Sequence, residues 1–374
     1  MAEVAIVQRR MTGYRLPLFE QMRERLARRG IRLRVLHGDP TPEEARKRDG
    51  GELPWAERCA TRYLAGGRLC WQDFGALTRA CELVIVTQEN KLAYNLVSMT
   101  LERPRRLAFW GHGRNLQSDS PEGLRERFKR WTTTRVDWWF AYTGLSRELV
   151  RAEGFPEERI TVLDNAVDTA ELRRLHAAIT AADRERVRRE LAPGAGPVGV
   201  FVGSLYADKR LGFLVEAALR LRARFPGFTL LVAGDGPDRG LVEAAARAHP
   251  WIRVLGPRHA RDKMELLAVS DVMLNPGLVG LGLLDAFVAG LPLVTTDCRL
   301  HSPEIAYLES GRNGLMTPDR LDAYVDGVAA LLAQPQRAEA LRAGARASAA
   351  RYTIENMSQR FCEGIERCLK ELRR

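Results

Sequence analysis

Short apolar runs alternate with amphipathic stretches along most of this chain of 374 residues, and that alternation limits the possible folds more than any other feature. Runs such as Val4–Val7, Leu83–Val86 and Thr229–Ala233 are typical of buried parallel strands. The stretch Leu211–Arg224 has the apolar spacing of a helix that covers a sheet. Because strands and helices alternate, we predict an α/β fold with parallel sheets.

The chain is too long for one ordinary hydrophobic core, so we expect two domains. The alternation stops over residues 170–190, which are rich in Ala, Arg and Glu, and a loop rich in Pro and Gly follows at 192–197. We predict a first domain over residues 1–170, a linker over 171–197, a second domain over 198–350 and a final amphipathic helix over 351–374.

Composition and short motifs exclude several classes of protein. No apolar run approaches the roughly 20 residues that a membrane-spanning helix needs, and the first residues lack the pattern of a signal peptide, so we expect a cytoplasmic location. The cysteines form no CxxC pair and have no histidines at zinc-site spacing, which predicts reduced thiols and no metal site. Neither half carries GxGxxG after its first strand, which disfavours a nicotinamide or flavin cofactor.

The net charge of +11 is concentrated in the first part of the chain. Residues 1–150 contain 27 Lys and Arg against 18 Asp and Glu, a balance of +9. An anionic partner would account for this balance: an acidic membrane surface, a phosphorylated acceptor or nucleic acid. Arginines on solvated helix faces would account for it equally well.

Residues 125–139 mix cations with Trp131, Trp138 and Trp139. This mixture suits contact with a membrane interface or with a lipid diphosphate. The competing interpretation, which we favour for Trp138 and Trp139, is a helix with a charged face that runs into a buried strand.

Residues 275–296 have the pattern of a loop, a helix that ends at Gly290 and a buried strand. Three glycines let the loop take tight conformations and let a ligand approach its backbone: Gly277, Gly280 and Gly282. A helix N-terminus near Leu283 offers free N–H groups to an anion, and Asp285 in its first turn suits sugar hydroxyls. The segment predicts a site for a phosphorylated sugar, and an ordinary αβ unit with a glycine-rich turn is the alternative.

Several segments occur in an order and at a spacing that resemble one known family. They are GVFVGSLYADKR at 199–210, AGDGP at 233–237, the segment 275–296, PEI with GRNGL across 303–315, WGHG at 110–113 and VLDNAVD at 162–168. The chain resembles the retaining glycosyltransferases of family 4, which have the GT-B fold. The resemblance implies two Rossmann-like domains that face each other across a cleft. It also implies that the final helix crosses back to the first domain.

The resemblance assigns roles to residues after the first strand of the second domain. It implies that Lys209 neutralises the diphosphate of a nucleotide-sugar donor. The family usually has an arginine five residues before this lysine, where this chain has Ser204, which can bind a phosphate but carries no charge. We expect the neighbouring Arg210 to supply the missing charge.

The resemblance also assigns roles within 275–296. Asp285 occupies the position of the family glutamate that holds the ribose hydroxyls, and Gly277 occupies that of the glutamate that contacts the donor sugar. Glycine cannot make that contact, so we expect Glu304 to replace the carboxylate. Backbone N–H groups at the start of the helix would bind phosphate and sugar, and they belong to Gly280, Leu281, Gly282 and Leu283.

Three further residues follow from the resemblance. His112 matches a histidine near the donor sugar, and Gly13 matches a glycine that lets the first domain approach the diphosphate. Arg258 lies near the expected position of the base. The alternatives are a packed histidine, a plain turn and a surface arginine.

The family mechanism needs no metal and no covalent intermediate, and this sequence has no DxD feature that would suggest a metal. We therefore expect a retaining transferase that takes a sugar from a nucleotide donor, UDP being favoured over GDP. The expected acceptor is a glycan or a lipid-linked molecule, with peripheral contact to the anionic inner face of a membrane and no nucleic acid. A pseudo-glycosyltransferase that acts as a binding subunit is the main alternative, because of Gly277 and Ser204. An epimerase or phosphorylase of the same fold is another.

Overall fold

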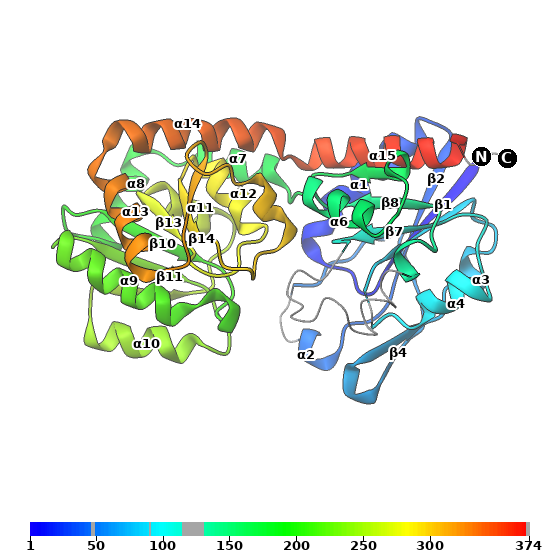
Figure 1. Cartoon of the computed structure of the whole chain (residues 1–374), viewed down its shortest axis with the longest axis horizontal. Coiled ribbons are helices and arrows are strands. Elements are labelled where there is room, and N and C mark those ends of the chain that lie inside the picture. Colours follow the sequence, from blue (N-terminus) through cyan, green and yellow to red (C-terminus); the bar gives the residue numbers. More distant parts are fainter. Residues whose placement is uncertain (46–48, 90, 114–130, 372–374) are drawn as a thin grey trace. The chain divides into compact units, whose positions relative to one another are not determined.

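The computed structural model describes residues 1–45, 49–89, 91–113 and 131–371 (Figure 1). The chain divides into two compact units, each with its own sheet. The N-unit consists of Met1–Asp168 and Ile354–Arg374, and the C-unit consists of Thr169–Thr353.

Within its described residues, the N-unit is built on a parallel sheet of order β3-β2-β1-β6-β7-β8-β9. These strands are β1 (Ala2–Gln8), β2 (Ile31–His37), β3 (Glu57–Arg58), β6 (Leu83–Thr87), β7 (Leu107–Gly111), β8 (Trp138–Ala141) and β9 (Ile160–Val162). β1 pairs with β2 in register from Ala2 opposite Ile31 to Gln8 opposite His37, and its central residues are fully buried. A separate antiparallel hairpin consists of β4 (Thr61–Leu64) and β5 (Leu69–Gln72).

Helices lie between these strands along the described part of the N-unit, as the alternation predicts. They are α1 (Leu16–Ala27), α2 (Pro42–Ala45), α3 (Gly75–Thr78), α4 (Tyr94–Thr100) and α6 (Gly144–Ala152), and α15 (Ile354–Glu371) joins the unit from the end of the chain. Short 3-10 turns occur at η1 (Gly13–Arg15), η2 (Ala65–Gly67) and η3 (Glu157–Arg159).

The final helix, α15, belongs to the N-unit and packs along α1 (Figure 1). Phe361 is fully buried there, stacked on Phe140 of β8 with ring centroids 4.5 Å apart and edge-on to Trp110 at 5.1 Å. Arg360 forms an ion pair with Asp164. The expectation that the last helix returns to the first domain is therefore confirmed.

Strand β8 decides between the two interpretations of Trp138 and Trp139. Both indoles are fully buried, and their N–H groups donate to Thr161 Oγ1 and to the carbonyl oxygen of Thr133, each at 2.9 Å. A membrane contact through these two residues is wrong, because the central sheet needs them in its core. Trp131 is partly exposed beneath the Arg135 guanidinium, and residues 125–130 lie outside the described part of the chain.

The sheet of the C-unit is also parallel, with the order β12-β11-β10-β13-β14-β15. Its strands are β10 (Val198–Val202), β11 (Thr229–Ala233), β12 (Ile252–Gly256), β13 (Val272–Leu274), β14 (Leu293–Thr296) and β15 (Gly314–Thr317). The covering helices are α9 (Leu211–Arg224), α10 (Arg239–Ala248), α11 (Ala260–Ala268), α12 (Gly282–Ala289), α13 (Leu321–Ala333) and α14 (Pro335–Arg351). Two 3-10 turns, η4 (Ala207–Lys209) and η5 (Pro303–Tyr307), complete the unit.

The segment expected as a linker contains two helices, α7 (Thr169–Ala177) and α8 (Ala181–Leu191). Both pack on α11, and α7 also packs on α12, so the segment is part of the C-unit. Thr180 and Asp183 form a capping box that starts α8.

Strand order places a ligand site at one edge of the C-unit sheet. The chain proceeds from β10 to β11 on one side and reaches β13 on the other, so β10 and β13 flank the point where the strand order reverses. Loops that follow two such strands diverge and leave a crevice at their carboxyl ends. These loops contain Lys209 and the segment that begins at Asn275.

We predict that Phe361→Ala lowers the free energy of unfolding of the N-unit by about 3–5 kcal/mol, because it removes a buried ring that joins α15 to the sheet. Urea unfolding followed by circular dichroism measures this change. Leu101→Ala, at a side chain 84% exposed, is the control and should change stability by less than about 0.5 kcal/mol. A similar loss in both variants would contradict the anchoring role of α15.

Candidate functional site

Two loops of the C-unit meet through their backbones at the reversal of strand order. We call residues 203–210 the Lys209 turn and residues 275–281 the Gly277 loop. The N–H of Leu278 donates to the carbonyl oxygen of Asp208 at 2.8 Å. A Cβ atom at position 277 would lie 2.2 Å from that same oxygen and 2.6 Å from the carbonyl carbon of Lys209. Position 277 therefore has no room for a side chain, because the backbone of the turn occupies the space.

Lys209 is buried between the two loops. Its Nζ donates to the carbonyl oxygen of Leu278 at 2.5 Å and lies 5.8 Å from the ring centroid of Tyr206. Burial lowers the pKa of Lys209 to about 8, because the charged amine loses hydration that one carbonyl does not replace.

Arg210 supports the same loop from a strained backbone position. Its φ of 55° lies in the left-handed region, which is unfavourable for a residue with a side chain. Its guanidinium forms an ion pair with Asp319 and lies 3.4 Å from both the carbonyl oxygen of Pro276 and Thr296 Oγ1. The charge of Arg210 is therefore next to the loop but already paired.

His301 and Thr296 hold the other side of the Gly277 loop. The N–H of Val279 donates to His301 Nδ1 at 3.1 Å, so the ring proton is on Nε2, which donates to the carbonyl oxygen of Thr296 at 2.8 Å. Thr296 Oγ1 donates to the carbonyl oxygen of Pro276 at 2.9 Å. Burial raises the pKa of the nearby Cys298 thiol, but hydrogen bonds from His301 and Thr296 outweigh burial and lower it overall.

The loop leads into the N-terminus of α12. The N–H groups of Gly280, Leu281 and Gly282 donate to none of the residues that the structure describes. They point from the positive end of a helix, which suits an anion. Gly290 ends the helix at a φ of 61°, as expected from the sequence.

Asp285, in the first turn of α12, is buried and forms an ion pair. Its Oδ1 accepts a hydrogen bond from Lys263 Nζ of α11 at 2.7 Å. A carboxylate held in this way keeps its second oxygen for a hydroxyl donor. Asp285, the residue predicted to bind the ribose, therefore has the Lys263 ammonium group beside it, and the sequence did not indicate this pairing.

The remaining predicted residues of the C-unit lie around this edge with different surroundings. Ser204 is exposed in the Lys209 turn. Arg258 follows β12 and lies 3.6 Å from Asp262. Glu304 is buried in η5, just after Ser302, whose N–H donates to the carbonyl oxygen of Val279 at 2.9 Å.

His112 and Gly13 belong to the N-unit and follow β7 and β1, at the carboxyl edge of its sheet. His112 is exposed with its ring against Tyr142, centroids 4.4 Å apart. The N–H of Gly13 donates to the carbonyl oxygen of Asp49 at 2.9 Å. Arg15 lies beside them, buried 4.6 Å from the Trp110 centroid and hydrogen-bonded to Asn165 Oδ1 at 2.9 Å.

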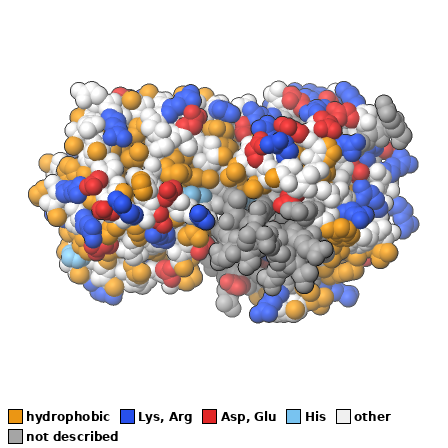
Figure 2. Space-filling view, viewed as in Figure 1, with side chains coloured by type: hydrophobic (Ala, Val, Ile, Leu, Met, Phe, Trp, Pro, Cys, Tyr) orange, Lys and Arg blue, Asp and Glu red, His pale blue; other side chains and the backbone are white. Residues whose placement is uncertain are grey.

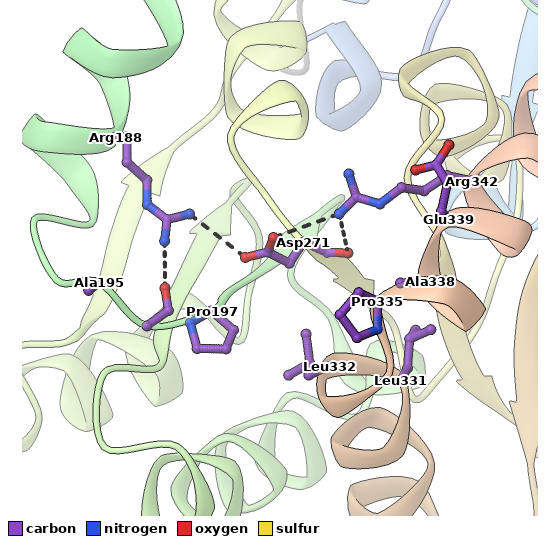
Figure 3. Close-up of a pocket in the computed structure, with 11 residues that line it drawn as sticks. Arg188, Ala195, Pro197, Asp271, Leu331, Leu332, Pro335, Ala338, Glu339 and Arg342 are labelled. Carbon is purple, nitrogen blue, oxygen red and sulfur yellow. Dashed lines mark hydrogen bonds and ion pairs between the residues drawn. The ribbon is translucent and has the colours of Figure 1, made fainter.

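A pocket of ≈ 410 Å³ lies at the opposite, amino end of β10 and β13 (Figure 3). Arg188 and Arg342 approach the Asp271 carboxylate from two sides, each at 3.7 Å. Arg188 also donates to the carbonyl oxygens of Gly196 and Val269. These cations tie helices to the sheet, and none of the predicted site residues lines the pocket.

Sequence reasoning missed Lys263, His301 and Arg15. Each forms a hydrogen bond with a residue remote in sequence, so the local sequence pattern does not reveal its role. Lys263, for example, is one polar residue on an amphipathic helix. Among the described residues, no group of His, Cys, Asp and Glu is arranged to hold a metal, and no helix there has the length and apolar character to cross a membrane.

Comparison with known proteins bears on both units. Residues 196–334 match the family model described as "Glycosyl transferases group 1". The chain is 27% identical over 191 residues to the alpha-D-kanosaminyltransferase of Streptomyces kanamyceticus, which covers 46% of this chain and 47% of that protein. The chain therefore matches about half the length of this curated relative.

Solved structures extend the likeness to the whole chain. HepE of Anabaena in complex with UDP has a TM-score of 0.73 at 16% identity, covering 98% of this chain and 100% of that one. WaaG, described as a glycosyltransferase involved in lipopolysaccharide biosynthesis, has a TM-score of 0.64 at 16% identity over 96% and 98%. At such identities the likeness shows the fold alone, and the fold is the one predicted from the sequence.

We predict that Gly277→Ala lowers the free energy of unfolding of the C-unit by about 1–3 kcal/mol, because the methyl group must push apart two backbones. Hydrogen exchange of the Leu278 N–H should accelerate at the same time. Gly240→Ala is the matched control, since a Cβ there meets nothing within 4 Å; it should leave stability unchanged or raise it by up to about 1 kcal/mol. Equal stability of the Gly277→Ala variant would disprove the close packing.

Proposed function

We propose that this chain, whose C-unit is a group 1 glycosyltransferase domain of the GT-B fold, transfers a glycosyl group from a UDP-sugar to a glycan or lipid-linked acceptor. The family recognised in the sequence motifs is confirmed by the match over residues 196–334. The Gly277 loop carries the proposal. It is a rigid backbone platform that ends in free N–H groups at the start of α12, with the Asp285 carboxylate one turn further.

The geometry of this edge supports a nucleoside diphosphate. The free N–H groups of Gly280, Leu281 and Gly282 would hold a phosphate, whereas the N–H of Leu283, also predicted to bind it, already donates to the carbonyl oxygen of Gly280 at 3.1 Å. The second oxygen of Asp285 would accept from ribose hydroxyls. HepE, which has the same fold, was crystallised with UDP and with UDP-glucose, and this favours UDP over GDP. Arg258 and Ser204 are proposed contacts of the base and of a phosphate.

Local packing requires glycine rather than the family glutamate at position 277, because any side chain there would collide with the Lys209 turn. This argues against simple decay into a binding subunit. Glu304, buried beside the Gly277 loop, is the proposed carboxylate near the donor sugar.

The reaction we propose retains the configuration of the sugar and needs no metal. The acceptor hydroxyl attacks the anomeric carbon on the face from which the diphosphate leaves, and the diphosphate takes the hydroxyl proton. Lys209 in its charged form stabilises the leaving diphosphate, supported by Arg210. The proposed contacts of His112 with the sugar and of Gly13 with the diphosphate follow from the family resemblance.

The charge of the N-unit is the basis for proposing an acceptor and a membrane contact. Its basic balance suits a phosphorylated or lipid-linked acceptor and peripheral contact with an anionic membrane from the cytoplasmic side. Kanosaminyl transfer and lipopolysaccharide synthesis in the relatives do not select one acceptor for this chain.

Calorimetric titration with UDP, GDP and 2′,3′-dideoxy-UDP tests the donor site. We expect UDP to bind, GDP to bind more weakly, and Asp285→Asn to weaken UDP at least tenfold, because it removes the charged acceptor for the ribose. The same variant should bind dideoxy-UDP as the parent chain does. Release of UDP from UDP-glucose in the presence of EDTA then tests the chemistry. Binding of none of the nucleotides would refute the proposal, and binding without turnover on any acceptor would favour the binding-subunit alternative.

We predict that kcat/KM for the donor falls as the pH rises through about 8, by up to tenfold per unit. The lowered pKa of Lys209 means that the free protein loses this charge well below pH 10.5, the usual pKa of lysine. The diphosphate requires the protonated amine. We therefore expect kcat/KM for the donor to be at its maximum below pH 8 and to fall above it. Initial rates between pH 6.5 and 9.5 measure the profile.

Lys209→Met should remove this pH dependence and lower kcat/KM on the order of 10²-fold. Lys91→Met, at a partly exposed lysine paired with Glu89, is the control and should keep the parent profile. A parent profile that stays flat to pH 9.5 would show that Lys209 does not act as a charged group on the donor.

A further inference from the structure

The β4–β5 hairpin of the N-unit presents an apolar outer face. Leu64 pairs across the two strands with Leu69, and Arg62 pairs with Trp71. All four are at least partly exposed: Leu64 is 51% exposed, Leu69 is 42% exposed, and Trp71 and Arg62 are also exposed. Leu64 and Leu69 therefore form a partly exposed apolar pair near the tip of the hairpin.

The inner face of the hairpin is firmly held, so the outer face has a defined orientation. The hydroxyl of Tyr63 donates to the carbonyl oxygen of Asp39 at 2.7 Å, and the amide of Gln72 donates to the carbonyl oxygen of Gln8 at 2.9 Å. On the outer face, the ring of Trp71 is held edge-on against Tyr94 of α4, with centroids 5.2 Å apart. The exposed leucines are therefore part of an ordered element.

The charge of the hairpin is entirely positive. Residues 58–72 contain three arginines and no acidic residue. Arg58 is paired with Asp39, whereas Arg62 and Arg68 form no ion pair with the residues that the structure describes. Figure 2 shows hydrophobic and basic side chains side by side at the lower edge of the view, where Figure 1 labels β4.

We propose that this outer face, formed by Leu64, Leu69, Trp71, Arg62 and Arg68, docks on an anionic lipid bilayer. The two leucines enter the acyl boundary, Trp71 lies at the headgroup level, and the two arginines bind lipid phosphates. Apolar tip residues rimmed by unpaired cations fit this partner better than a protein surface, whose matching patch would have to be both apolar and acidic. The inference locates the membrane contact named in the proposed function, but it rests on the hairpin alone.

Sedimentation of the full chain with vesicles tests this docking. Vesicles of 70% phosphatidylcholine and 30% phosphatidylglycerol should bind the protein at low salt, and both 0.5 M NaCl and pure phosphatidylcholine vesicles should release it. The double variant Leu64→Glu with Leu69→Lys removes the apolar tip, keeps the net charge and places opposite charges across the strands. It should weaken binding at least tenfold.

Two further variants make the result specific. Arg62→Glu with Arg68→Glu should weaken binding to anionic vesicles to a similar extent, and it serves as the test if the leucine variant does not fold. Leu241→Glu, at a leucine 44% exposed on α10 of the C-unit, is the matched control and should bind as the parent does. Because the hairpin belongs to the N-unit, and Lys209 and Asp285 belong to the C-unit, nucleotide affinity should be unchanged in both hairpin variants.

Several results would overturn the inference. They are absence of binding of the parent chain to anionic vesicles, full binding by both hairpin variants, or an equal loss in the Leu241→Glu control. Concentration-dependent dimers that require the two leucines, without vesicle binding, would assign the face to self-association instead. Failure of nucleotide binding with intact vesicle binding would refute the proposed donor site and leave the docking surface standing.

Discussion

The close approach of two backbones at Gly277 is the contact on which the rest of the C-unit site depends. It lets Leu278 bond to the Lys209 turn, and it brings the carbonyl groups of the loop within reach of Lys209 and Arg210. His301 and Thr296 complete the support from the far side. A loop bound from both sides directs α12 so that its first N–H groups face outward at the edge of the sheet. Absence of a side chain is thus the condition for the platform, and it explains why a position expected to carry a carboxylate carries none.

This platform concentrates charge in a poorly hydrated place. Lys209 loses much of its hydration for one carbonyl partner, and its pKa falls accordingly. Asp285 and Lys263 also lose hydration, but each neutralises the charge of the other across a distance of 2.7 Å. An arriving diphosphate would restore a counter-charge to the amine, so its binding would favour the protonated form.

The two units obtain rigid edges from elements that are remote in sequence. In the N-unit, α15 holds the segment after β9 through Arg360 and Asp164, while Arg15 bonds to Asn165 in the same segment. In the C-unit, residues that follow β14 hold the loop that follows β13. Such supports resemble one another physically: a polar side chain forms a hydrogen bond or ion pair with a backbone, amide or carboxylate group of a segment remote in sequence.

Local pattern was enough to predict the parallel sheets and the helices that alternate with them. The order of the motifs carried the family resemblance, and that resemblance implied the return of the final helix. Apolar periodicity, Gly290 as a helix stop and the order of motifs are properties of neighbouring residues, and they carry this information directly. The pattern missed β15 and the β4–β5 hairpin, because strands of four residues are too short to show a clear periodicity. Tertiary structure alone decided four features: the pairing of Asp285 with Lys263, the hydrogen bonds of His301 to the Gly277 loop, the burial of Lys209 and the exposure of the hairpin leucines. Each depends on which distant segments meet, and a contact between remote residues leaves no spacing in the chain from which it could be read.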